Sequence, residues 1–181
     1  MAGDSTRGTG LVHIYCGDGK GKTTCGMGLC ARAAGYGLRV LIYQFMKDNR
    51  TSERRLLEQS DHITFVDGLE NEKFSFRMSP EEKQQRAVYY GSQLQKVIRE
   101  AAEGDYDVLF LDEAVYAVRA GLLDEQALTD FLDHKPEKLE VILTGRDPGE
   151  ALCARADYIS RIEKVKHPFD RQIPARKGIE R

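Results

Sequence analysis

The chain has 181 residues, which suffices for one well-buried domain and is short for two, so we expect a single domain. Its 27 basic and 29 acidic side chains leave a net charge of −2, which removes a global electrostatic basis for binding nucleic acid or anionic membranes. The apolar runs are far shorter than the roughly 18 residues of a membrane span. The first ten residues also lack the apolar core of a signal peptide, so the sequence predicts a cytoplasmic protein.

Apolar runs rich in β-branched residues alternate along the chain with longer amphipathic stretches. This alternation predicts an α/β fold in which helices cover both faces of a mainly parallel, six-stranded sheet. The predicted strands cover residues 11–16, 39–45, 63–66, 107–112, 139–144 and 158–165. A helix is predicted over 22–35 and a long one over 80–103, where Ser79 and Glu82 form a capping box. Shorter helices are predicted after residues 113, 124 and 148.

The remaining segments are predicted to be connections and chain ends. Residues 46–60 and 67–78 are polar but contain a few large apolar side chains, so we expect them to be mobile segments over a site. Residues 1–10 are expected to form a flexible N-terminus, 11–166 the domain and 167–181 an irregular tail. The cysteines at 16, 25, 30 and 153 have no zinc-binding spacing and are expected to be reduced, mostly buried thiols.

The stretch YCGDGKGKTTCGMG, residues 15–28, contains most of a phosphate-binding P-loop. Its second half, Gly21-Lys22-Thr23, follows an apolar strand and begins a helix, which is the context that the motif requires. Glycines let backbone N–H groups turn toward phosphate, the helix N-terminus adds positive charge, lysine neutralises and threonine offers a hydroxyl to Mg²⁺. The predicted nucleotide-binding residues are Gly17, Asp18, Gly19, Lys20, Gly21, Lys22, Thr23 and Thr24. The alternative is a glycine-rich turn without a ligand.

Cys16 stands where the usual P-loop has its first glycine. That glycine helps to shape the loop around a phosphate that will be cleaved. Its replacement leads to the hypothesis of a modified grip on a triphosphate rather than the loss of one.

A second motif, DVLFLDEAVY, ends a predicted strand on Asp112 and Glu113. An acid at this position in P-loop proteins holds the metal directly or through water. Because the carboxyl ends of parallel strands gather at one edge of a sheet, both carboxylates are expected beside Thr23. The alternative is that Asp112 only caps the following helix.

Two arginines, two phenylalanines and a histidine could each be either structural or ligand-binding. Arg32 is three turns along the first helix, and its spacing favours the surface. Arg146 follows a strand at the ligand-binding edge but could instead pair with the neighbouring aspartate. Phe74 and Phe76 either anchor their loop to the core or form a flat wall for a planar ligand. His167 lies in a basic tail that is either solvated or in contact with a ligand.

Taken together, several segments resemble the P-loop type ATP:corrinoid adenosyltransferases. The segments are GDGKGKTT, GLCARAAGYG followed by VLIYQFMK, FLDEAVYAV, ILTGRDP and ADYISRIEKVKHPFDRQIPARKGIE, and they span about residues 10 to 180. The resemblance implies a RecA-like P-loop fold. It also implies transfer of the 5′-deoxyadenosyl group of ATP to the Co(I) centre of cobalamin or cob(I)yrinic acid a,c-diamide, with release of triphosphate, as a step of cobalamin biosynthesis. The family is described as holding ATP reversed relative to ordinary P-loop enzymes, which agrees with the altered loop.

The resemblance also implies residue roles. Lys22, Thr23 and Glu113 would be catalytic, with Thr23, Asp112 and Glu113 at the metal. The nucleotide site would gain Arg32, and the corrinoid site would contain Phe74, Phe76, Arg146 and His167. The family's aromatic motif FTWE reads FSFR here, so the tryptophan and the acid are both replaced.

The cofactors and partners implied by the resemblance are ATP, Mg²⁺ or Mn²⁺, and a corrinoid reduced to Co(I). A flavoprotein or another reductase would supply the electron, the chain would form a homodimer, and residues 167–181 would fold over the corrinoid. Two other functions are compatible with the P-loop and the acidic pair: a P-loop ATPase or small-molecule kinase, and a nucleotide-dependent binding module without turnover.

Overall fold

The computed structural model describes residues 9–73 and 75–180. Its centre is a six-stranded sheet in the order β3-β2-β4-β5-β1-β6, in which every neighbouring pair is parallel. The strands are β1 (Val12–Cys16), β2 (Val40–Gln44), β3 (Ile63–Val66), β4 (Val108–Asp112), β5 (Glu140–Thr144) and β6 (Tyr158–Arg161). All six predicted strands are therefore confirmed.

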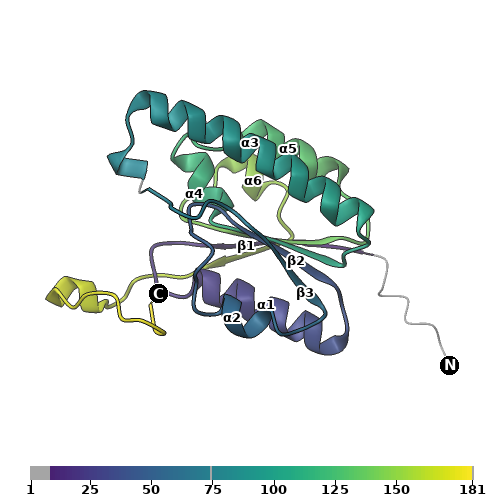
Figure 1. Cartoon of the computed structure of the whole chain (residues 1–181), viewed down its shortest axis with the longest axis horizontal. Coiled ribbons are helices and arrows are strands. Elements are labelled where there is room, and N and C mark those ends of the chain that lie inside the picture. Colours follow the sequence, from purple (N-terminus) through teal and green to yellow (C-terminus); the bar gives the residue numbers. More distant parts are fainter. Residues whose placement is uncertain (1–8, 74, 181) are drawn as a thin grey trace.

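Helices cover both faces of the sheet, as predicted. In Figure 1, α1 and α2 lie on one side of the sheet, and α3, α4, α5 and α6 lie on the other. Their bounds are α1 (Lys22–Tyr36), α2 (Arg54–Leu57), α3 (Pro80–Glu103), α4 (Ala114–Arg119), α5 (Glu125–His134) and α6 (Glu150–Cys153). Two short 3-10 helices are η1 (Ser75–Arg77) and η2 (Pro168–Arg171). The connections 46–60 and 67–78 thus contain α2 and η1, and their mobility stays a prediction.

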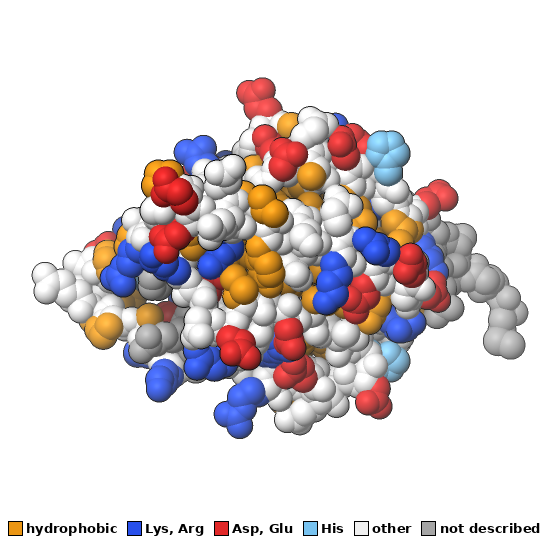
Figure 2. Space-filling view, turned by 45° about the horizontal axis from the view of Figure 1, so that its top comes forward, with side chains coloured by type: hydrophobic (Ala, Val, Ile, Leu, Met, Phe, Trp, Pro, Cys, Tyr) orange, Lys and Arg blue, Asp and Glu red, His pale blue; other side chains and the backbone are white. Residues whose placement is uncertain are grey.

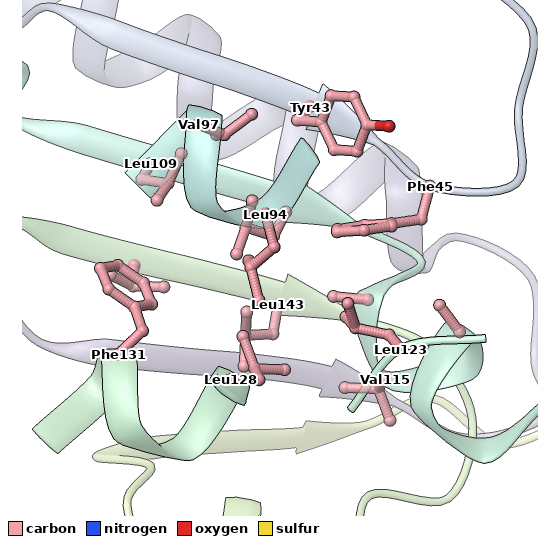
Figure 3. Close-up of a cluster of buried hydrophobic side chains, with 14 of the residues drawn as sticks. Tyr43, Phe45, Leu94, Val97, Leu109, Val115, Leu123, Leu128, Phe131 and Leu143 are labelled. Atoms are coloured by element: carbon pink, nitrogen blue, oxygen red, sulfur yellow. The ribbon is translucent and has the colours of Figure 1, made fainter. Parts of the chain in front are cut away.

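Each face of the sheet has its own apolar core, because successive strand side chains point to opposite sides. On one side, α3 contributes Leu94 and Val97, and α5 contributes Leu128, and all three are fully buried against strand residues such as Leu143 (Figure 3). On the other side, α1 packs against the second set of strand side chains, which includes Phe110. Burying one such side chain contributes about 1.5–3 kcal/mol, so the sheet and its helices form one stable scaffold.

Local signals set the helix ends. The predicted capping box is present, since Glu82 N–H donates to Ser79 Oγ (3.2 Å) and Ser79 N–H donates to Glu82 Oε2 (2.7 Å). The first helix runs past its predicted end at residue 35, because the left-handed glycine that terminates it is Gly37, at φ 98°. The Gly37 N–H donates to Ala34 O (2.9 Å).

The cysteines are only partly as expected. All four are free thiols, and Cys16 and Cys30 are buried, but Cys153 is half-buried and Cys25 is exposed on the first turn of α1. The expectation of mostly buried thiols is therefore wrong for Cys25.

Within residues 9–73 and 75–180, no helix combines the length and apolar character needed to cross a bilayer. On the face shown in Figure 2, acidic and basic side chains are interspersed, in keeping with the small net charge.

Candidate active site

The functional residues gather at the end of the sheet where the parallel strands terminate. The P-loop follows β1, while Asp112 and Thr144 are the last residues of β4 and β5. In Figure 1, η1 and the C-terminal tail lie at this same end of the molecule. Because open α/β sheets bind their ligands outside the carboxyl ends of the strands, this is the candidate active site.

The structure shows how the P-loop forms without its first glycine. Cys16 is the last residue of β1 and pairs in register with Arg161 of β6, so its backbone is extended and needs no glycine. The turn begins one residue later, at Gly17, which has φ 104°. A Cβ at Gly17 would lie 2.3 Å from the carbonyl oxygen of Ile162, which excludes larger residues there.

The segment after β6, residues 162–164, is hydrogen-bonded to the P-loop. Gly19 N–H donates to Ile162 O (2.8 Å), and Lys164 N–H donates to Asp18 Oδ1 (3.0 Å). These bonds also explain why β6 ends at Arg161 rather than at 165, since residues 162–164 turn toward the loop instead of extending the sheet.

Lys22 begins α1 and bends back over the loop. Its Nζ donates to Gly19 O at 2.7 Å, and burial lowers the pKa of its ammonium. Gly21 caps the helix in a left-handed conformation, at φ 119°, and offers no side chain to the first-turn N–H groups. This arrangement directs backbone donors and the positive helix end toward an anion.

Asp112 is fully buried and is the centre of a hydrogen-bond network. Its Oδ1 accepts from the hydroxyls of Thr144 (2.6 Å) and Thr23 (3.0 Å), and its Oδ2 accepts from Lys47 Nζ (2.6 Å) and Gln44 Nε2 (2.9 Å). Burial favours the protonated acid, but the Lys47 charge and the hydrogen bonds outweigh it, so the pKa of Asp112 is lowered. Of the two carboxylates predicted beside Thr23, Asp112 is confirmed by its hydrogen bond to the Thr23 hydroxyl.

Glu113 lies beside this network in a left-handed conformation, at φ 59°, and immediately precedes α4. Its N–H donates to Thr144 Oγ1 (2.8 Å). Burial, and next the charge of Asp112, raise the pKa of Glu113, which Lys47, Lys22 and Arg146 oppose. A half-buried acid next to an ionised one is stabilised by an added cation.

The oxygen donors at this position fit a hard cation such as Mg²⁺. They are the hydroxyl of Thr23 and the carboxylates of Asp112 and Glu113, and Mg²⁺ is commonly held by one or two carboxylates together with water and substrate phosphates. Among the described residues, no three His, Cys, Asp or Glu side chains cluster into a ready-made metal site. A cation here would therefore need phosphate or water oxygens to complete its coordination.

A cavity of about 290 Å³ joins the P-loop to the C-terminal tail. Lys20 and Lys22 line it from the loop, Arg146 from the segment after β5, and His167 from the tail. The structure thus brings predicted nucleotide-binding and corrinoid-binding residues to one cavity. Asp147 pairs with Arg119 (3.9 Å), so the alternative partner considered for Arg146 is engaged elsewhere.

The predicted loop residues Asp18 and Gly19 also line this cavity, whereas Arg32, Thr24 and Phe76 do not. Arg32 is exposed on α1, ten residues and so about 15 Å along the helix axis from Lys22. Thr24 is exposed on the first turn of α1. Phe76 is 74% exposed in η1, where the Arg77 guanidinium lies 5.6 Å from its ring centre. Phe74 lies outside the described residues.

Sequence reasoning missed Lys47, Gln44 and Thr144, which are three of the four donors to Asp112. Gln44 and Thr144 are the last residues of β2 and β5, and Lys47 follows β2 by three residues. Their position at strand ends is the signal that could have identified them, since parallel strands end together.

Comparisons of the sequence with a family model and with known proteins agree on one family. The model of the family described as ATP:corrinoid adenosyltransferase BtuR/CobO/CobP matches residues 8–181. The chain is 30% identical to the corrinoid adenosyltransferase of Escherichia coli, over 94% of this chain and 85% of that protein. It is 31% identical to the corrinoid adenosyltransferase CobA of Salmonella typhimurium, with the same coverage. Among solved structures, a KaiC-like protein of Pyrococcus horikoshii is similar in fold, with a TM-score of 0.52 at 18% identity over 86% of this chain and 73% of that one.

Proposed function

Since the chain belongs to the ATP:corrinoid adenosyltransferase family, we propose a mechanism in which its P-loop holds the triphosphate of ATP as a leaving group while a corrinoid is adenosylated. The resemblance seen in the sequence is confirmed, and the chain is an enzyme that transfers the adenosyl group of ATP to a corrinoid. The alternatives of an ordinary ATPase or kinase and of a binding module without turnover are not favoured by this membership.

In the proposed step, the cobalt of a Co(I) corrinoid attacks the ribose C5′ of ATP. A Co–C5′ bond forms and the C5′–O bond to the α-phosphate breaks. The electron pair of the broken bond leaves with the intact triphosphate, and cobalt is formally oxidised from Co(I) to Co(III). Negative charge therefore builds up on the phosphate chain, so the protein accelerates the step by placing cations and N–H donors there.

The observation that carries this proposal is the cavity shared by the P-loop, Arg146 and the tail. Lys20 and Lys22 enter it from the loop, and the first turn of α1 directs its N–H groups to the same place. We assign the triphosphate to residues 17–24, with Lys20 and Lys22 offsetting its charge. Arg32 lies farther along α1 and would contact the nucleoside only if ATP extended along that helix.

Thr23, Asp112 and Glu113 would hold a Mg²⁺ or Mn²⁺ ion, which supplies positive charge to the departing triphosphate. The support is the 3.0 Å contact between Thr23 and Asp112, together with a neighbouring carboxyl whose pKa is already raised. Lys22, Thr23 and Glu113 are the residues we propose to be catalytic, because they meet the phosphate chain and its cation.

The corrinoid would bind next to the cavity, where Arg146 and His167 present polar groups. The tail, residues 167–181, would fold over the bound corrinoid. Phe76, with Phe74, would lie under the corrin ring and exclude the lower axial ligand of cobalt, which eases reduction of Co(II) to Co(I). The exposure of Phe76 supports this role, since a ring already buried in the core could not meet a ligand. A flavoprotein or another reductase would provide the electron, and the working unit would be a homodimer.

Product analysis tests this proposal. The enzyme is incubated with ATP, Mg²⁺ and a chemically reduced corrinoid, and triphosphate and a light-sensitive adenosylated corrinoid are expected in equal amounts. Lys22→Ala should lower the rate by at least about a hundredfold, as for loss of one group that stabilises transition-state charge. The matched control Lys138→Ala removes an exposed lysine that pairs with Asp105 and should leave the rate unchanged. ADP or phosphate as the main product would contradict the proposed step.

A further inference from the structure

Lys47 contacts the P-loop, although the two are well separated in the sequence and the Lys47 side chain is partly exposed. Its Nζ lies 2.6 Å from Asp112 Oδ2 and 2.9 Å from Thr23 Oγ1. Its ammonium therefore contacts both the hydroxyl and the carboxylate that we assign to the divalent cation. The side chain of Asp112 is fully buried and that of Lys47 is 24% exposed, so the pair lies at the inner end of the site.

The backbone directs Lys47 to this position. After β2, Phe45 N–H donates to Asp112 O (2.9 Å), which keeps the chain beside β4. Met46 then adopts a left-handed conformation, at φ 56°, which is uncommon for a residue other than glycine. The hydroxyl of Tyr90 accepts from Met46 N–H (2.9 Å) and holds this turn. The turn brings the Lys47 side chain back over the strand ends.

An ammonium and a divalent cation compete for the same oxygen atoms at this point. Lysine donates three hydrogen bonds from a compact charge on a flexible stem, so it can occupy a cation position and can also leave it. A bound triphosphate offers several anionic oxygens nearby, which gives the displaced ammonium a new partner. Without the triphosphate, an entering metal would force two cations together and deprive Lys47 of its acid.

We propose that Lys47 is an internal cation that holds the Thr23–Asp112 position in the nucleotide-free enzyme and moves to the triphosphate when metal and nucleotide bind together. Metal binding then requires nucleotide, and the free enzyme is protected from capturing divalent cations unproductively. This inference rests on the metal site of the proposed function.

The test measures binding of Mn²⁺, as the probe, to the nucleotide-free protein from the loss of the free-ion signal in electron paramagnetic resonance. Lys47→Met removes the ammonium but keeps an unbranched side chain. It should bind Mn²⁺ at least about tenfold more tightly than the unmodified protein, a typical size for coupling between two ligands. Lys47→Arg keeps a cation and should bind Mn²⁺ as weakly as the unmodified protein. Lys138→Met, which removes a lysine from a surface Lys–Asp pair, is the matched control and should change nothing.

A Thr23→Val change in the Lys47→Met protein assigns the site, and it should reverse the gain in Mn²⁺ affinity. Lys47→Met binding Mn²⁺ no more tightly than the unmodified protein would overturn the inference. If Thr23→Val nevertheless raises the Mg²⁺ concentration needed for half-maximal adenosyl transfer, the proposed metal site stands and only the role of Lys47 fails. Tight Mn²⁺ binding that survives Thr23→Val would contradict both.

A second measurement keeps the inference testable if Lys47→Met does not fold. The side-chain NH₃⁺ resonance of Lys47 is observed by ¹H–¹⁵N NMR in the unmodified enzyme and is identified by its loss in Lys47→Arg. Addition of ATP with Mg²⁺, without corrinoid, should shift this resonance, whereas Mg²⁺ alone should not. A resonance that does not respond to Mg²⁺ and ATP would show that the ammonium stays on Asp112 and would overturn the inference.

Discussion

Thr144 links the two acidic residues of the site through one hydroxyl group. Thr144 Oγ1 donates to Asp112 Oδ1 at 2.6 Å and accepts the backbone N–H of Glu113 at 2.8 Å. Replacement by valine preserves the shape and the strand preference of the side chain but removes both hydrogen bonds. Thr144→Val therefore tests whether this network stabilises the fold.

The expected loss has two parts. A hydrogen bond to a charged acceptor contributes about 1.5–3 kcal/mol, and a buried N–H left without an acceptor costs about 1–3 kcal/mol. Asp112 keeps three other donors, so the first part should lie at the lower end of its range. We expect Thr144→Val to lower the free energy of unfolding by about 2.5–4.5 kcal/mol.

The matched control is Thr129→Val. Thr129 is also buried, but its hydroxyl donates only to the carbonyl of Gln126 within α5 (3.0 Å), so the loss should not exceed about 1.5 kcal/mol. Urea unfolding is followed by circular dichroism, because the chain contains no tryptophan. If both variants lose the same stability, the reasoning about the Asp112 network is wrong.

Three further substitutions test the proposed role of Phe76, the pairing of Glu140 with His13, and the stability of the segment 67–78. Phe76→Ala should slow adenosylation that starts from Co(II) by about tenfold or more and leave the reaction from preformed Co(I) within about twofold; equal slowing of both would refute the ring-wall role. Burial favours the neutral form of Glu140, but its hydrogen bonds with His13 and with the Leu11 N–H outweigh burial and lower its pKa below the ordinary 4.5. The charged carboxylate therefore stabilises the fold fully above about pH 4.5, and this stability is lost as the pH falls through the folded pKa. Glu140→Gln should therefore cost stability at pH 7 and less at pH 4, which urea unfolding at both values measures; a cost independent of pH would contradict the assignment. Arg86→Met removes the half-buried partner of Glu72 and should speed proteolytic cleavage within residues 67–78, whereas Arg99→Met on the exposed side of the same helix should not.

Much of the fold could be predicted because its signals are local. Each strand is a short apolar run, and the start of α3 depends on two side chains three residues apart, so one window of sequence contains the information. The P-loop is equally local, since residues 17–21 form one turn between a strand and a helix. The predicted end of α1 lies one residue before the observed end at Tyr36, because Gly35 and Gly37 are both compatible with a stop and only Gly37 adopts the left-handed conformation.

The Asp112 network could not be predicted because it depends on strand order. Lys47 and Asp112 are 65 residues apart in sequence, and they meet because β2 lies directly beside β4. Thr144 reaches the same acid because β5 lies on the other side of β4. Hydrophobic periodicity identifies strands but does not state which of them are neighbours. Interpretation from the sequence therefore found the acid and the P-loop threonine but not the lysine between them.

Hydrogen bonds between the P-loop and residues 162–164 connect the loop to the C-terminal tail. The loop is held by Gly19 N–H on Ile162 O and by Asp18 on Lys164 N–H, and the chain that provides these groups leads within a few residues to His167 and the tail. A triphosphate that draws the loop N–H groups inward must act on bonds shared with residues 162–164. The tail that we propose to fold over the corrinoid is thus anchored to the loop that we propose to bind the triphosphate. If the tail folds over the corrinoid as we propose, nucleotide binding should position it before the corrinoid arrives, because the loop is fixed between β1 and α1, whereas residues 171–179 are exposed along their whole length.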